Sequence, residues 1–137
     1  MVQLLQFFDT YNKGYVYDRK KEYNIQNNQL TNLYLKINDI MFIFNFAHIT
    51  RNHWEKFLNG ILSNYKTKNR NNVTLYLIKE EHNEISWTYY NVENYIIIRM
   101  NNNNNIFHIT IENNDLDELL EDISKLYSIK IFGTKYD

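Results

Sequence analysis

Four histidines are the side chains of this chain best suited to acid–base or metal chemistry. They are His48, His53, His82 and His108, and none falls in an HExxH or HxH spacing that would bind a metal locally. His48 and His53 flank the start of a predicted helix, where polar residues suit the entry of the chain into the helix. A metal site assembled from distant strands stays open, although no local ligand geometry favours one.

Three glutamates surround one of these histidines in a predicted turn between two strands. Glu80, Glu81 and Glu84 lie around His82, and a carboxylate beside an imidazole could act in general acid–base catalysis. Such a group needs burial or a fixed neighbour to tune its pKa. A solvent-exposed turn provides neither, so we interpret the group as a charged, soluble turn.

Other catalytic motifs are missing from the sequence. It contains no cysteine, which excludes a thiol nucleophile, a thiolate zinc site and a disulfide. Gly14, Gly60 and Gly133 are isolated from one another, so no glycine-rich phosphate loop is present. No GxSxG motif occurs. We therefore predict that the protein is not an enzyme and has no catalytic residue, no cofactor and no metal.

Length and composition predict one domain spanning residues 1–137, since 44% hydrophobic and 16% aromatic content supply a core. The formal net charge of −1 gives no basic excess of the kind that nucleic-acid-binding proteins carry. The lack of cysteine and of an apolar leader favours the cytoplasm, of a bacterium or of a host cell. The apolar runs are far shorter than the ~20 residues that cross a bilayer. Abundant asparagine and no proline indicate an AT-rich genome.

A helix is predicted over residues 50–65, and the rest of the chain is organised around it. Its apolar residues recur at the spacing of one buried helical face. Thr50 is the expected N-cap, because its hydroxyl can accept from a first-turn N–H. The predicted buried face consists of Trp54, Phe57, Leu58, Ile61, Leu62 and Tyr65.

Alternating apolar and polar residues predict that most of the remaining chain forms strands joined by short turns. The segment 40–47 is apolar on both faces over its first half, which predicts a central strand. Strands are expected at 2–8, 15–17, 33–37, 40–47, 73–78, 85–90, 95–100, 106–112 and 129–132.

A second amphipathic helix is predicted over about 115–127, with Asn114 as its cap and an i,i+4 ion pair between Glu121 and Lys125. Short connections between successive strands imply an antiparallel meander. The predicted fold is therefore α+β, a curled antiparallel β-meander sheet with two amphipathic helices packed on it.

An N-terminal hairpin and the loop after it form the predicted partner-binding segment. Its tyrosines alternate with polar residues, and a displayed aromatic ring can fill a pocket on a partner. The alternative is that these tyrosines lean back onto the domain. The candidate residues are Tyr11, Tyr15, Tyr17, Arg19, Lys20, Lys21 and Tyr23.

Nucleic acid binding is the alternative function. A basic connector follows the first helix, and strand aromatics with interleaved basic groups can hold single-stranded nucleic acid. The neutral charge balance opposes this reading. The residues concerned are Lys66, Lys68 and Arg70, with Tyr34, Tyr76, Trp87 and Tyr90.

Two segments, FNFAHITRNHWEKFLNGI and IFHITIENNDLDELLEDISKL, resemble bacterial immunity proteins that neutralise secreted polymorphic toxins of the wall-associated type. In that family an apolar strand precedes a helix of pattern W/E-x-x-F-L-x-x-L, then a meander and a closing Leu-rich helix. The resemblance covers roughly residues 30–127 and implies a small cytoplasmic inhibitor that binds a toxin and carries no catalytic residues. We therefore expect a non-enzymatic protein-binding inhibitor, either an immunity protein or a phage or viral inhibitor of a host defence factor.

Overall fold

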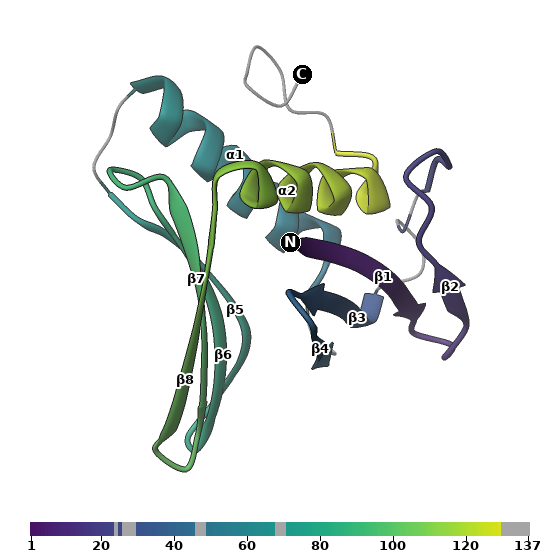
Figure 1. The fold of residues 1–137 in the computed structure, drawn as a ribbon, viewed down its shortest axis with the longest axis horizontal. Coiled ribbons are helices and arrows are strands. Elements are labelled where there is room, and N and C mark those ends of the chain that lie inside the picture. The colour runs from purple at the N-terminus through teal and green to yellow at the C-terminus, as the bar shows by residue number, and fades with distance from the viewer. Residues whose placement is uncertain (24, 26–29, 46–48, 68–70, 130–137) are drawn as a thin grey trace.

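The strands form two antiparallel sheets, and two helices pack against them (Figure 1). The computed structural model describes residues 1–23, 25, 30–45, 49–67 and 71–129, without the side chains of 65–67. Sheet A has the order β2-β1-β3-β4 and sheet B the order β5-β6-β7-β8. This confirms the predicted α+β class, with the strands divided between two sheets rather than placed in one. The elements are β1 (Val2–Asp9), β2 (Gly14–Val16), β3 (Leu30–Ile37), β4 (Ile40–Asn45), α1 (Arg51–Thr67), β5 (Val73–Glu80), β6 (Asn83–Tyr90), β7 (Tyr95–Asn102), β8 (Asn105–Glu112) and α2 (Asn113–Tyr127).

Sheet B is the predicted four-stranded meander, and asparagine makes its tight turns. Asn103 and Asn104 join β7 to β8 with φ values of 51° and 69°. Two successive residues with positive φ are what a two-residue hairpin of the favoured twist requires, and asparagine tolerates that conformation well. The run of five asparagines in the sequence is therefore a hairpin and its flanks.

Strand β4 lies at the edge of sheet A, so the prediction of a central strand is wrong. The turn at Asn38 and Asp39 places β4 beside β3, and β1 takes the other side of β3. Among the described residues, β4 pairs with β3 alone. Its apolar residues on two faces have different surroundings, since Phe44 is buried in the core while Ile43 is exposed. The predicted end of this strand, residues 46–47, lies outside the described residues.

Thr50 occupies the predicted N-cap position of α1, since it directly precedes the helix and its carbonyl accepts from the N–H of Trp54 at 3.3 Å, whereas the cap of α2 differs from the prediction. The backbone N–H of Thr50 donates to His53 Nδ1 at 3.0 Å, and the Thr50 hydroxyl lies 3.0 Å from the same nitrogen. The imidazole of His53 thus caps α1 in the manner of a capping box. Helix α2 begins at Asn113, with Glu112 as an N-cap whose side chain makes no cap bond, so Asn114 is not the cap.

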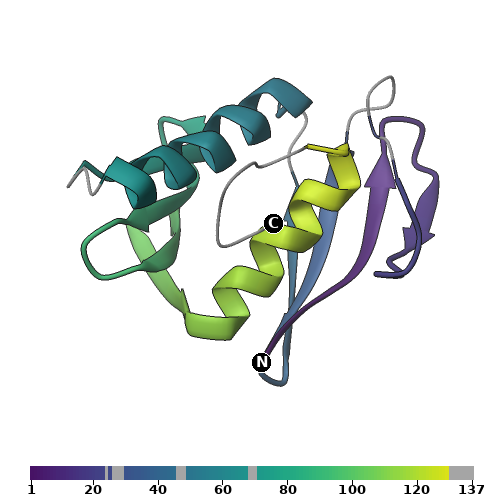
Figure 2. The same ribbon diagram turned by 90° about the horizontal axis from the view of Figure 1, so that it is seen from above.

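Both helices turn their apolar faces to the core, and Figure 2 shows that α2 lies between the two sheets. Helix α1 packs on β5, and α2 packs on β1 and β8. Arg51 Nε donates to the carbonyl of Tyr127 at 3.0 Å and so ties the start of α1 to the end of α2. No helix in the described part of the chain is long and apolar enough to span a membrane.

The core joins both sheets and both helices through aromatic rings. Trp54 of α1 lies 5.3 Å from Trp87 of β6 and 6.2 Å from Tyr127 of α2, between ring centroids. Trp87 in turn meets Phe44 of β4 edge-on at 5.8 Å. Such aromatic pairs add about 0.5–1.5 kcal/mol each beyond their buried area. The predicted buried face of α1 is confirmed for Trp54, Phe57, Leu58, Ile61 and Leu62.

Candidate functional site

The N-terminal hairpin predicted to bind a partner is folded back onto the domain by most of its tyrosines. Tyr15 stacks on Phe7 with ring centroids 4.9 Å apart, and Tyr23 meets Phe7 edge-on at 5.2 Å. Tyr17 stacks on Tyr23 at 5.7 Å. All three tyrosines are half-buried against the core. These three tyrosines therefore lean back onto the domain, which is the alternative that the sequence analysis left open for this segment.

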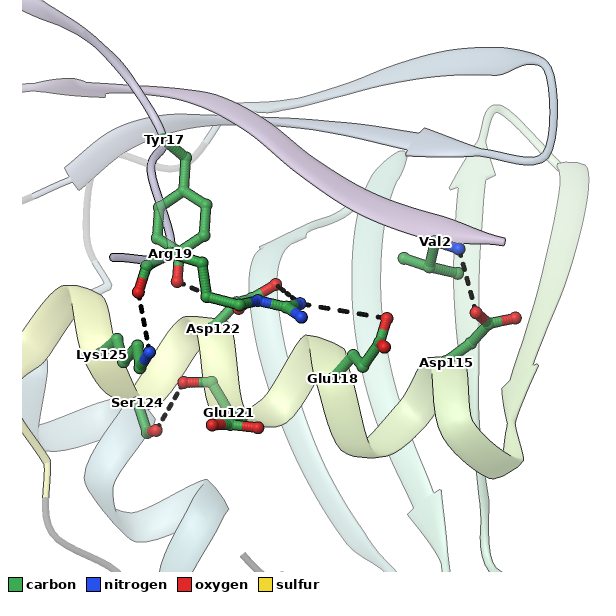
Figure 3. Close-up of polar contacts among 9 residues, drawn as sticks. All are labelled: Val2, Tyr17, Arg19, Asp115, Glu118, Glu121, Asp122, Ser124 and Lys125. Atoms are coloured by element: carbon green, nitrogen blue, oxygen red, sulfur yellow. Dashed lines mark hydrogen bonds and ion pairs between the residues drawn. The ribbon is translucent and has the colours of Figure 1, made fainter. Parts of the chain in front are cut away.

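A buried carboxylate on α2 holds the loop that follows the hairpin (Figure 3). The side chain of Asp122 accepts from Tyr17 Oη at 3.0 Å, from Arg19 Nε at 3.0 Å and from Arg19 Nη2 at 2.9 Å. Asp122 is only 3% exposed. A buried charge is tolerated where it is paired and hydrogen-bonded in this way. Asp122 therefore anchors residues 17–19 to the helix.

The same contacts shift two pKa values. Burial raises the pKa of the Tyr17 phenol well above its usual range, and the neighbouring Asp122 carboxylate raises it further. The hydrogen bond to Asp122 raises the pKa of the Arg19 guanidinium. The phenol is therefore a neutral donor and the guanidinium a permanent cation in this cluster, as a buried carboxylate requires.

Three further contacts fix the loop along α2. Lys125 Nζ donates to the carbonyl of Arg19 at 2.8 Å, so the predicted pairing of Lys125 with Glu121 is replaced by a contact with the loop. Ser128 Oγ donates to the carbonyl of Tyr23, and the N–H of Ile25 donates to the carbonyl of Leu126 at 3.1 Å. These bonds make the loop a strap bound along the helix.

Three of the predicted partner-binding residues remain turned to solvent. Tyr11 is 77% exposed at the tip of the hairpin. Lys20 and Lys21 are also exposed. Tyr15, Tyr17, Arg19 and Tyr23 instead hold the fold together. The structure thus keeps only part of the predicted segment available to a partner.

A second surface, which the sequence analysis did not identify, is the outer face of sheet A. Strand register places Val16, Gln6, Tyr34 and Ile43 in one cross-strand row on this face. Phe8 contacts Tyr34 diagonally, with ring centroids 5.4 Å apart. The row thus reaches both edges of the sheet and is apolar except at Gln6, which lies between Val16 and Tyr34.

The edge of this face is apolar and strongly exposed. Met41 and Ile43 of β4 are 49% and 51% exposed. Helix α2 packs against β1 on the opposite, core-facing side of sheet A and lies between the two sheets in Figure 2. Edge strands in soluble proteins are usually protected by charge or by a covering element. Strand β4 contains no charged residue.

Charge is almost absent from sheet A. Its four strands contain two charged residues, Asp9 and Lys36, and Asp9 is buried. Lys36 pairs with Gln3 and Met41 on the outer face. Residues 40–43 are apolar on both faces, and this feature of the sequence could have revealed the surface. In the sequence analysis we instead interpret it as the mark of a central strand.

A cleft of about 940 Å³ runs beside β5. Seven consecutive residues of this strand, Thr74 to Glu80, form one wall. The other wall comes from sheet A and the hairpin turn, and the first turn of α1 closes one end. Among the described residues, this second group comprises Asn12, Thr31, Asn32, Asn45, Ile49 and His53.

The residues proposed for nucleic acid stacking are only partly available. Trp87 is fully buried in the core, and Tyr34 and Tyr90 are half-buried. Tyr76 is exposed, with Lys79 Nζ 4.4 Å from its ring centroid. The side chain of Lys66, and residues 68 and 70 as a whole, lie outside the described residues. A stacking platform would therefore have to be built on Tyr76.

The histidines are dispersed in the described structure. His53 caps α1, while His82 and His108 lie exposed on sheet B; His48 lies outside the described residues. His82 Nε2 is 3.7 Å from Glu81 on the surface of the turn. Among the described residues, no three His, Asp or Glu side chains gather closely enough to hold a metal ion.

Comparisons of the chain with protein-family models, with curated proteins and with solved structures found no match. The functional argument therefore depends on the geometry of the surfaces described above. The outer face of sheet A combines the exposed Val16, Met41 and Ile43 with almost no charge.

Proposed function

We propose that the protein is a non-enzymatic inhibitor that binds a partner protein through the outer face of sheet A. The observation that carries the proposal is the exposed pair Met41 and Ile43 beside the half-buried Tyr34 on an almost uncharged sheet. Contiguous exposed apolar surface of this kind marks protein-interaction sites. Tyrosine and methionine are also enriched in the cores of such interfaces, where charged residues are depleted.

Burial of this face would supply substantial binding energy. Fully burying a Met or Ile side chain contributes about 1.5–3 kcal/mol relative to leaving it exposed. Met41 and Ile43 are each about half exposed, so each can contribute roughly half of that on binding. The tilted ring pair of Phe8 and Tyr34 offers a rigid aromatic contact that loses little conformational entropy on binding.

The resemblance to toxin-immunity proteins supports an inhibitory role, and an AT-rich phage or viral source would equally suit an inhibitor of a host defence factor. Both would bind a protein partner by surface complementarity, and both work in the cytoplasm. Tyr11 lies at the tip of the hairpin adjoining the β2 edge of the sheet, where it would extend the contact at its rim. Lys20 and Lys21 lie beside α2, with Ser124, Lys125 and Ser128.

The test is a comparison of proteins captured by the wild type and by two matched variants. Ile43→Asp places a charge on the outer face of sheet A. Ile106→Asp is the control, because Ile106 is 55% exposed on the edge strand β8 of the other sheet. The partner is the protein that the wild type and Ile106→Asp retain and that Ile43→Asp loses. When this protein is purified and mixed with the wild-type inhibitor, its own activity should fall.

Two results would reject the proposal. If no protein distinguishes the two variants while both melt like the wild type, the outer face is not the binding surface. If the captured complex contains nucleic acid and its affinity falls steeply with salt, phosphate contacts dominate and the nucleic-acid-binding alternative gains support.

A further inference from the structure

We propose that the cleft beside β5 binds an extended, uncharged segment of a partner protein by strand addition. Successive side chains of a strand point to opposite faces of its sheet. A cleft lined by every residue from Thr74 to Glu80 therefore follows the edge of β5 rather than one of its faces. Among the described residues β5 pairs only with β6. The register of β5 shifts at Leu77, between Tyr76 and Ile78, so the outward N–H and C=O groups on either side of this irregularity are the template that an added strand requires.

The dimensions of the cleft suit a short extended peptide. A run of seven strand residues spans about 20 Å at about 3.3 Å per residue. The cleft volume of about 940 Å³ lies near the top of the roughly 300–1,000 Å³ range of ligand sites. An elongated space with a strand edge as one wall matches a peptide better than a compact small molecule.

The opposite wall of the cleft can hydrogen-bond the backbone groups on the second edge of an added strand. Three asparagines, Asn12, Asn32 and Asn45, lie on that wall. An asparagine amide carries two donors and one acceptor oxygen, so it can bond either the N–H or the C=O of a peptide. An added strand would thus meet hydrogen-bonding groups on both of its edges, main-chain groups of β5 on one side and side-chain amides on the other.

The charges around the cleft favour an uncharged ligand. Lys79 and Glu80 are neighbours of opposite sign at one end, and His53 lies on the wall contributed by α1. The ammonium of Lys79 is 4.4 Å from the ring centroid of Tyr76, which holds it at the rim. A charged side chain entering the cleft would lose water without a dedicated counter-charge, which is costly.

A second copy of this chain suits the cleft less well. Its edge strands belong to four-stranded sheets, and the wall formed by Asn32 and Asn45 would obstruct the rest of such a sheet. A free segment or terminal strand of another protein has no attached sheet. The cleft therefore admits a single strand.

This inference goes beyond the proposed function and does not depend on it. The outer-face residue Ile43 is not among the residues that line the cleft. Ile43→Asp should therefore abolish capture of the partner at the outer face while leaving peptide binding in the cleft unchanged. Either proposal can fail without the other.

The probe is a phage-displayed library of random heptapeptides, selected on the full-length chain. Enriched peptides are synthesised, and their Kd is measured for the wild type and three variants. Asn45→Trp fills the cleft from an exposed position and should weaken binding about tenfold or more. Asn102→Trp, at an exposed strand position outside the cleft, and Ile43→Asp should stay within about twofold of the wild type.

Strand addition is then distinguished from side-chain binding by two readouts. Amide hydrogen exchange should slow in β5 on peptide binding but not in β8, the other edge of the same sheet. Peptides N-methylated at alternate residues should lose more binding in the register whose amides face β5 than in the register whose amides face the asparagines, because every second amide of a strand faces the same neighbour. Failure to enrich any peptide, equal Kd values for Asn45→Trp and wild type, or protection of β8 instead of β5 would each overturn the proposal.

Discussion

The guanidinium of Arg19 meets the carboxylate of Asp122 through two hydrogen bonds, Nε to Oδ1 at 3.0 Å and Nη2 to Oδ2 at 2.9 Å. The pair joins residues separated by 103 positions in the chain. Glu118 stands 3.9 Å from the same guanidinium. In the sequence Arg19 belongs to a short basic run typical of a surface. The two parallel hydrogen bonds explain why it instead holds the loop on α2.

Arg19→Ala should destabilise the protein by about 1–3 kcal/mol, because the buried carboxylate of Asp122 would lose two of its three donors. Lys20→Ala is the matched control, since Lys20 is an exposed basic neighbour and its removal should stay within about 0.5 kcal/mol. Urea unfolding measures both. Equal stability of the two variants would mean that the Asp122 anchor contributes nothing.

Alkaline pH should weaken the fold through Tyr17. Its pKa is raised in the folded protein by burial and by Asp122, while the unfolded phenol ionises near pH 10. The stability linked to the neutral phenol is therefore fully present below about pH 10 and is lost as pH rises above it. Tyr17→Phe removes this group, so its melting temperature should fall less than that of the wild type between about pH 8 and pH 11. Parallel curves for the two proteins would contradict the assignment.

Phe57→Ala should cost about 3–5 kcal/mol, as do other truncations of large buried side chains. Phe57 is buried on α1 in edge-on contact with Trp54, with ring centroids 6.4 Å apart. Lys56→Ala, one residue away and exposed, provides the comparison in thermal or urea unfolding. A Phe57→Ala protein that melts within a degree or two of wild type would refute the packing of this helix on the sheets.

His53→Ala should lower stability by about 1 kcal/mol, the usual value of a helix cap, and leave partner binding at the outer face of sheet A intact. His82→Ala removes an exposed turn residue and should change neither property. Melting temperature and capture of the partner are measured for each variant. A folded His82→Ala protein that no longer binds would place this histidine in the interface.

Periodicity was sufficient to predict most of the fold. The spacing of Trp54, Phe57 and Leu58 fixed the buried face of α1, and the alternation around Trp87 and Ile98 fixed the strands of sheet B. These patterns are local, because each helix or strand exposes one face to water and buries the other, and the spacing of its apolar residues records this. The predicted strand at 129–132 extends into residues that the structure does not describe, and only Ile129, which is buried, can be placed.

Neighbours distant in the sequence could not be predicted in the same way. The order of strands in sheet A depends on which side of β3 each hairpin takes, so β4 could not be recognised as an edge from its own residues. Likewise, Arg19 and Asp122 meet only because the strap runs along α2. The cleft beside β5 arises from elements contributed by both halves of the chain.

The most direct test of the central claim is the Kd of the purified partner for Ile43→Asp, with Ile106→Asp measured beside it. Ile43→Asp would leave a buried, unpaired charge in the interface, and hot-spot substitutions cost about 2 kcal/mol or more, which is roughly a thirtyfold loss of affinity. We predict at least that loss for Ile43→Asp and an affinity within about twofold of wild type for Ile106→Asp. Unchanged affinity of a folded Ile43→Asp protein would show that the outer face of sheet A does not bind the partner.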